Sequence, residues 1–133
     1  SYIIEGSQNG CIRILSSDNL SCLASFQSCH NQVEVISIEA SRNSDIFLVN
    51  CSDRVIRIFD LKSAFDSKFV QPLVEMQDQV NKVSWASAIF SCGSEYVVTC
   101  SHKHDMLFIW DIMSGTLIKT LSLHVGEKFV DLA

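Results

Sequence analysis

A short segment of the chain occurs three times, and this recurrence limits the fold more than any other feature of the sequence. NGCIRILS, DRVIRIFD and HDMLFIWD align without gaps and begin at residues 9, 53 and 104, so the copies are 44 and 51 residues apart. Each copy contains β-branched or aromatic residues in the composition that favours β-strands. A unit that recurs at such an interval is typical of proteins built from repeated, mutually packed sheets.

Eleven short runs in all have strand composition, and clusters of Asn, Asp, Gly and Ser separate them. They are Tyr2–Ile4, Cys11–Leu15, Leu23–Phe26, Val35–Ile38, Ile46–Asn50, Val55–Phe59, Leu73–Met76, Val83–Ile89, Tyr96–Cys100, Met106–Trp110 and Leu117–Leu121. The insertion LKSAFDSKFVQP follows Asp60 and explains the longer second interval. It is expected to hold a short helical turn before Pro72 returns the chain to an extended path.

Four antiparallel strands in an interval of roughly 40 to 45 residues form one blade of a WD-repeat propeller. We therefore expect an all-β fold, a partial WD40 β-propeller of about three four-stranded antiparallel blades that occupies residues 1–133 as one domain. The blades are expected around residues 1–26, 33–77 and 83–121, and residues 129–133 are expected to start a further blade. Because propellers normally need at least four blades, we expect this chain alone not to close a ring and to be a fragment of a longer propeller.

Composition excludes several other classes of protein. The chain has 133 residues and is 47% hydrophobic, which is enough to bury a core. No apolar run approaches the roughly 18 residues that span a bilayer, so no membrane partner is expected. A net charge of −5 argues against a surface that binds nucleic acid over its whole extent. The six cysteines include no CxxC pair, so we expect buried thiols in a cytosolic or nuclear protein.

The stretch CSHKHD, residues 100–105, raises an alternative function. Cys100, His102 and His104 alternate, and on an extended strand they would share one face, as the ligands of a zinc site do. The repeat instead assigns this stretch to the end of a strand and the turn after it, which breaks the alternation. No HExxH or CxxC motif supports a metal site, so no metal or other cofactor is expected. A metal-dependent enzyme remains the alternative, and a stoichiometric zinc signal would favour it.

Several side chains are expected to hold the blades together. In WD repeats an Asp six residues before the Trp lies in the turn between the second and third strands, bonds to nearby amides and braces a loop His. Asp53 has this spacing, the candidate loop histidines are His30 and His124, and the corresponding position in the third copy is His104. The expected turn and blade residues are Asp53, Asp60, Trp110 and Asp111. The aromatic residues expected in the core are Phe47, Phe59, Trp85, Phe90, Phe108 and Trp110.

Longer motifs carry a more specific resemblance. DRVIRIFD and the stretch from Met76 to Ala133 resemble the later blades of the retinoblastoma-binding protein five family. These are WD-repeat subunits of COMPASS and mixed-lineage-leukaemia type histone methyltransferase complexes. The matching motifs include QD-V-N----W at residues 77–85, F-S-x-G-x-E-Y-V at residues 90–97 and G-E-x-x-x-D-L-A at residues 126–133. The resemblance covers the chain from about Ile46 onward.

The resemblance implies a non-catalytic scaffold subunit of a histone H3 lysine-4 methyltransferase complex in the nucleus. Its partners would be the other protein subunits and the nucleosome, with no small-molecule substrate. Lys62 and Lys103 correspond to positions at which the family touches nucleosomal DNA, whereas Val125 replaces an arginine that the family tends to carry. The alternative is a WD40 adaptor of another assembly, such as a ubiquitin ligase receptor or an RNA-processing particle.

Overall fold

A computed structural model describes residues 1–66, 70–80, 82–103 and 105–122, which form eleven β-strands and one α-helix. In chain order these are β1 (Tyr2–Gly6), β2 (Cys11–Ser16), β3 (Cys22–Gln27), β4 (Val35–Ala40), β5 (Ile46–Cys51), β6 (Ile56–Asp60), α1 (Leu61–Asp66), β7 (Val74–Met76), β8 (Trp85–Phe90), β9 (Tyr96–Ser101), β10 (Met106–Asp111) and β11 (Leu117–Ser122).

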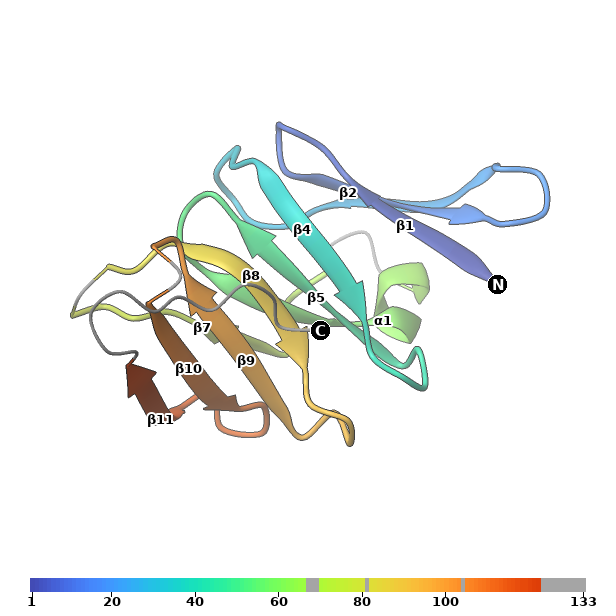
Figure 1. Ribbon diagram of the computed structural model, residues 1–133. Helices are drawn as coiled ribbons and strands as arrows, with labels where there is room; N and C mark the ends of the chain where they lie inside the picture. The colour runs from blue at the N-terminus through green and yellow to red at the C-terminus, as the bar shows by residue number, and fades with distance from the viewer. Residues whose placement is uncertain (67–69, 81, 104, 123–133) are drawn as a thin grey trace.

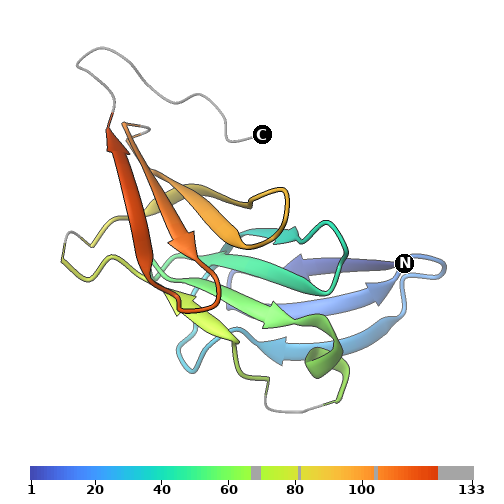
Figure 2. The ribbon, with the colours of Figure 1, turned by 90° about the horizontal axis from the view of Figure 1, so that it is seen from below.

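The strands form three antiparallel sheets in which each strand pairs with its neighbour in sequence. The first sheet contains β1 to β3, the second β4 to β7 and the third β8 to β11. The sheets stand side by side in chain order (Figure 1), and the view from below shows the second sheet between the other two (Figure 2). The predicted all-β propeller architecture with an open ring is confirmed. No helix among the described residues has the length and apolar character to span a membrane.

The structure differs from the sequence prediction in a few places. Each of the eleven predicted runs forms a strand, and the predicted helical turn is α1, but β8 begins at Trp85 rather than at Val83. The first sheet has three strands, which correspond to the three runs predicted within residues 1–26. In the repeat, β1 corresponds to β5 of the second sheet. A strand of the first sheet that would correspond to β4 and β8 is therefore not among the described residues. The predicted start of a further blade at residues 129–133 lies outside the described residues.

Alternating side chains place the core in two layers, one at each junction between sheets. Along β5, Phe47 and Val49 face the first sheet while Leu48 faces the third, because successive strand residues point to opposite faces. In β6 the same alternation sends Phe59 toward the first sheet and Ile58 toward the third. The second sheet is therefore buried on both faces, and almost every residue of its strands β5 and β6 is buried.

The turns gather at two ends of the sheets, which we call the upper and lower ends as they lie in Figure 1. The upper end holds the turns between β1 and β2, β5 and β6, and β9 and β10. The lower end holds α1 and the turns between β4 and β5, β8 and β9, and β10 and β11. Contacts between the second and third sheets support this assignment of the ends. At the upper end the Trp85 indole donates to the Arg54 carbonyl at 3.2 Å, and at the lower end Arg42 Nη1 lies 3.4 Å from Cys92 Sγ.

Candidate functional site

The turn between β5 and β6 is organised by Asp53. Its Oδ1 accepts a hydrogen bond from the Val55 amide at 3.3 Å, which closes the turn around Arg54 at φ 70°. Both carboxylate oxygens also accept hydrogen bonds from Arg57, from Nη1 at 3.2 Å and from Nη2 at 2.6 Å. A carboxylate and a guanidinium joined by two hydrogen bonds form a directional, charge-assisted pair.

The partner of Asp53 differs from the expected histidine. The charged group that binds Asp53 is Arg57 from the same hairpin, and His30 lies instead beside Arg57 in a pocket. An arginine four residues further along the chain reaches the carboxylate with two donors, which a single imidazole nitrogen does not match. The other candidate histidine, His124, lies outside the described residues.

Arg57 is a charged residue in the core, with 6% of its surface exposed. Burial acts to lower the pKa of its guanidinium, but the hydrogen bonds and negative charge of Asp53 outweigh this effect and raise the pKa above its ordinary value. Glu75, which lies opposite Arg57 on β7, places a carboxylate oxygen 3.6 Å from Nε. Arg57 therefore stays cationic between two carboxylates.

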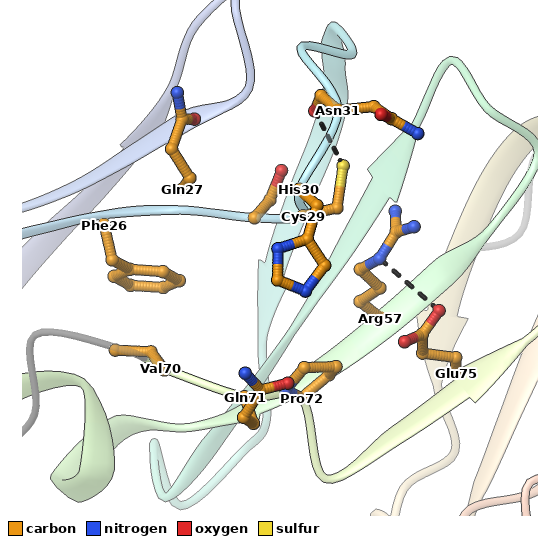
Figure 3. A pocket seen from close by; sticks show the side chains of 11 residues that line it. Phe26, Gln27, Cys29, His30, Asn31, Arg57, Val70, Gln71, Pro72 and Glu75 are labelled. Carbon is orange, nitrogen blue, oxygen red and sulfur yellow. Dashed lines mark hydrogen bonds and ion pairs between the residues drawn. The ribbon is translucent and has the colours of Figure 1, made fainter.

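A pocket of about 310 Å³ opens beside Arg57, between the outer strands of the first and second sheets (Figure 3). We call it the rim pocket. Its lining consists of residues 26–31, Arg57, residues 70–72 and Glu75. Phe26, Val70 and Pro72 form its apolar wall, and the His30 ring points into it between them and Arg57 (Figure 3).

The junction between the second and third sheets is filled by aromatic rings instead. The repeat position of Arg57 is Phe108 in the third copy, and its ring lies 4.9 Å from that of Trp85 in an edge-to-face arrangement. Trp110 lies 5.9 Å from Trp85 and donates from its indole nitrogen to the Thr99 hydroxyl at 3.0 Å. Asn50, buried in β5, donates to the Trp85 carbonyl at 3.0 Å and so bonds the two sheets directly.

Asp60 and Asp111 make the same local contacts at equivalent positions of two repeats. Asp60 Oδ2 accepts from the amide and hydroxyl of Ser63 at 2.9 and 2.8 Å. Asp111 Oδ2 accepts from the amide and hydroxyl of Ser114 at 3.1 and 2.7 Å. In each case the carboxylate satisfies backbone donors as the chain leaves the strand, as an N-cap residue does. Of the aromatic residues expected in the core, Phe90 alone is only half-buried.

The histidine-rich stretch is a strand end and a turn. Cys100 is buried in β9, and burial raises the pKa of its thiol. Ser101 donates to Asp105 at 2.9 Å across the turn, and His102 is exposed. His104 lies outside the described residues. Among the residues that the structure describes, no three His, Cys, Asp or Glu side chains are placed to hold a metal ion.

The expectation of buried cysteines is only partly right. Cys51 and Cys100 are buried, but Cys22 and Cys92 are exposed. All six cysteines lie in the described part of the chain and are thiols. The two exposed ones lie at the edge strand β3 and in the β8–β9 turn, where the packing of neighbouring sheets does not reach them.

Lys62 and Lys103 lie at opposite ends of the sheets. Lys62 is exposed on α1 at the lower end, and Lys103 is exposed in the β9–β10 turn at the upper end. Their role as DNA contacts remains a prediction, and Val125 lies outside the described residues.

Two further cations accompany Lys103 at the upper end and were not singled out from the sequence. Arg54 is exposed in the β5–β6 turn, and Lys82 is exposed just before β8. A hollow of about 260 Å³ there is lined in part by Arg54, Ser84 and His102. The His102 amide donates to the Ser84 carbonyl at 3.0 Å, which brings the segments of Lys82 and Lys103 together. For one of these cations, Arg54, the sequence signal is the repeat alignment, which places it directly after Asp53 in the turn.

Comparison with known proteins gives the chain its relatives. No family profile matches it. The retinoblastoma-binding protein 5 homolog of Drosophila melanogaster is 35% identical over 137 residues, which cover 98% of this chain and 28% of that protein. The COMPASS component SWD1 of Saccharomyces cerevisiae is 30% identical over 117 residues, which cover 84% of this chain and 26% of that protein. The chain is a homologue of these proteins.

A solved structure agrees with the sequence relatives. The crystal structure of the Cps50 (Swd1) β-propeller domain of Myceliophteria thermophila superimposes with a TM-score of 0.79 at 25% identity, covering 92% of this chain and 40% of that one. The predicted resemblance to retinoblastoma-binding protein five is confirmed. The chain spans little more than a quarter of the length of the two relatives compared above.

Proposed function

We propose that this chain is part of a non-catalytic WD-repeat scaffold subunit of a COMPASS-type histone H3 lysine-4 methyltransferase complex. The observation that carries the proposal is the similarity of nearly the whole chain to proteins named as a COMPASS component and a Set1 complex component. The described side chains with unusual electrostatics support a structural role, because Asp53 and Arg57 neutralise each other inside a junction between sheets. A chromatin-modifying complex implies a nuclear protein.

The decisive experiment is co-purification of the full-length protein from nuclear extract. A tag on the protein is expected to recover a SET-domain methyltransferase subunit in stoichiometric amount. Recovery of ubiquitin ligase or RNA-processing subunits without a methyltransferase would establish the adaptor function instead. A matched purification of an unrelated WD-repeat protein is the control for non-specific recovery.

We further propose that the upper end faces nucleosomal DNA. Three exposed cations, Arg54, Lys82 and Lys103, lie at this end, and Arg54 lines the hollow between the second and third sheets. Contacts from lysine and arginine to phosphates give affinity without sequence preference, which suits a subunit that docks on many nucleosomes. Such a local cluster is compatible with a net charge of −5 for the whole chain.

A further inference from the structure

The rim pocket lies beside an arginine that has two carboxylate partners, of which only Glu75 lines the pocket. Arg57 is bound by both oxygens of Asp53 at 2.6 and 3.2 Å, so its charge is already paired. Glu75 reaches only the Nε atom, at 3.6 Å, and 53% of its side chain is exposed. Two carboxylates therefore face one guanidinium, and the less tightly held carboxylate lies where a ligand can reach it.

The apolar wall of the pocket suits a long aliphatic stem. Phe26 and Val70 are almost fully buried and line the pocket on the side away from Glu75, and Pro72 continues this apolar lining toward Glu75 (Figure 3). Lysine and arginine side chains bury their methylene groups along apolar surface while the charged head remains at a polar group. A wall of this kind facing a carboxylate matches both parts of such a side chain.

Other ligand classes fit less well. An anion would meet the Glu75 carboxylate, and the charge of Arg57 is already offset by Asp53 through two hydrogen bonds. An uncharged apolar ligand would remove water from Glu75, whose side chain is 53% exposed and only loosely paired with Arg57 at 3.6 Å, and removal of water from a loosely paired carboxylate is unfavourable. The net charge of −5 also favours the approach of a cationic partner.

We propose that the rim pocket binds a lysine or arginine side chain presented by a basic segment of a partner protein. The inference deepens the proposed scaffold function, because it assigns a class of partner to one junction between sheets. The cationic head pairs with Glu75, and its stem lies against Phe26 and Val70. Arg57 serves as a positioning residue that holds Glu75 at the mouth of the pocket.

The test is a titration of the full-length protein, labelled with ¹³C at valine methyl groups, and Val70 is the reporter inside the pocket. The probe is an acetylated and amidated pentapeptide with one lysine among glycines. Matched peptides carry norleucine or glutamate in place of the lysine. We expect saturable shifts of the Val70 methyl signals at millimolar concentrations of the lysine peptide. Glu75→Gln should weaken this binding about threefold to fivefold, as loss of a partly exposed ion pair does.

The controls separate charge from structure. Glu75→Asp keeps the carboxylate and should restore most of the affinity, and Glu95→Gln, in the β8–β9 turn, should leave it unchanged. Absence of Val70 shifts with the lysine peptide, equal binding of the norleucine peptide, or tighter binding of the glutamate peptide would each overturn the proposal. Failure of the methyltransferase co-purification would count against the scaffold function alone, since the titration needs only the protein and the peptide.

Discussion

Trp110 combines a large apolar ring with one buried hydrogen bond, and these two contributions can be measured separately. Trp110→Ala removes a ring that packs against both Trp85 and Phe108 and should lower the free energy of unfolding by about 3 to 5 kcal/mol. Thr99→Val removes only the acceptor of the indole N–H and should lower it by about 1 kcal/mol. Urea denaturation of both variants is the measurement. Equal losses would mean that the ring contributes no packing.

The reactivity of the thiols toward an alkylating reagent should depend on their accessibility and on their pKa. Burial raises the pKa of Cys51 and Cys100, so at neutral pH each holds less of the reactive thiolate than an ordinary cysteine. Iodoacetamide should label Cys22 and Cys92 rapidly and Cys51 and Cys100 only after unfolding. Mass spectrometry of the timed reaction, with a urea-unfolded sample as the control, gives the order. Rapid labelling of Cys51 in the folded protein would contradict the described packing.

Glu39 should make stability fall slightly as pH rises. Burial raises its pKa above the ordinary 4.5, and the hydrogen bond from the Phe90 amide offsets part of this effect. A raised pKa means that the folded state holds the proton more tightly, so the favourable contribution is complete below pH 4.5 and is lost as pH rises through the folded-state pKa. Glu39→Gln should therefore increase the free energy of unfolding at pH 7 but not at pH 4. A gain of the same size at both pH values in urea titrations would exclude this explanation.

Two turn glycines differ in backbone angle and in the space around them, so the same substitution to alanine should affect stability differently at each. Gly10 has φ +85°, and a Cβ added there would lie 2.6 Å from the Val33 carbonyl oxygen. Gly10→Ala should lower the free energy of unfolding by about 1 to 3 kcal/mol, because both the backbone angle and the space oppose it. Gly93→Ala in the β8–β9 turn meets nothing nearer than 3.9 Å and should be neutral or raise stability by up to about 1 kcal/mol. Thermal unfolding of the two variants decides between these outcomes.

The elements could be predicted well because their signals are local. Strand composition and the turn residues between runs placed all eleven strands, and the insertion after Asp60 placed α1. The boundaries were less accurate: β8 was expected two residues earlier, because Val83 has strand composition although no ladder forms there.

The candidate site could not be predicted to the same extent, because its geometry depends on packing between sheets. Asp53 has the expected spacing and pairs with Arg57 of its own hairpin, but the position of His30 beside Arg57, and not as the partner of Asp53, depends on where two sheets meet. The rim pocket likewise exists because Arg57 occupies the place that Phe108 fills at the other junction. Neither fact is visible in the local sequence.

At the scale of the whole molecule, the two ends should contribute differently to DNA binding. If the upper end faces DNA, Lys103→Gln and Lys82→Gln should each reduce the slope of log affinity against log salt by about 0.9 without changing sequence preference. Lys62→Gln, at the lower end, is the matched control and should leave the slope unchanged. Binding of the full-length protein to duplexes of different sequence, at several salt concentrations, is the measurement. An equal effect at Lys62 would show that DNA is not held at the upper end alone.

Asp53 and Arg57 are four residues apart on one hairpin, so their ion pair needs no other sheet to form. Hairpins close within microseconds, whereas contacts between distant segments form later. The guanidinium can thus be neutralised while water still surrounds it, and no unpaired charge has to enter the interface when the first sheet arrives. We expect Asp53→Asn to slow the docking of the first sheet onto the second much more than it slows closure of the β5–β6 hairpin.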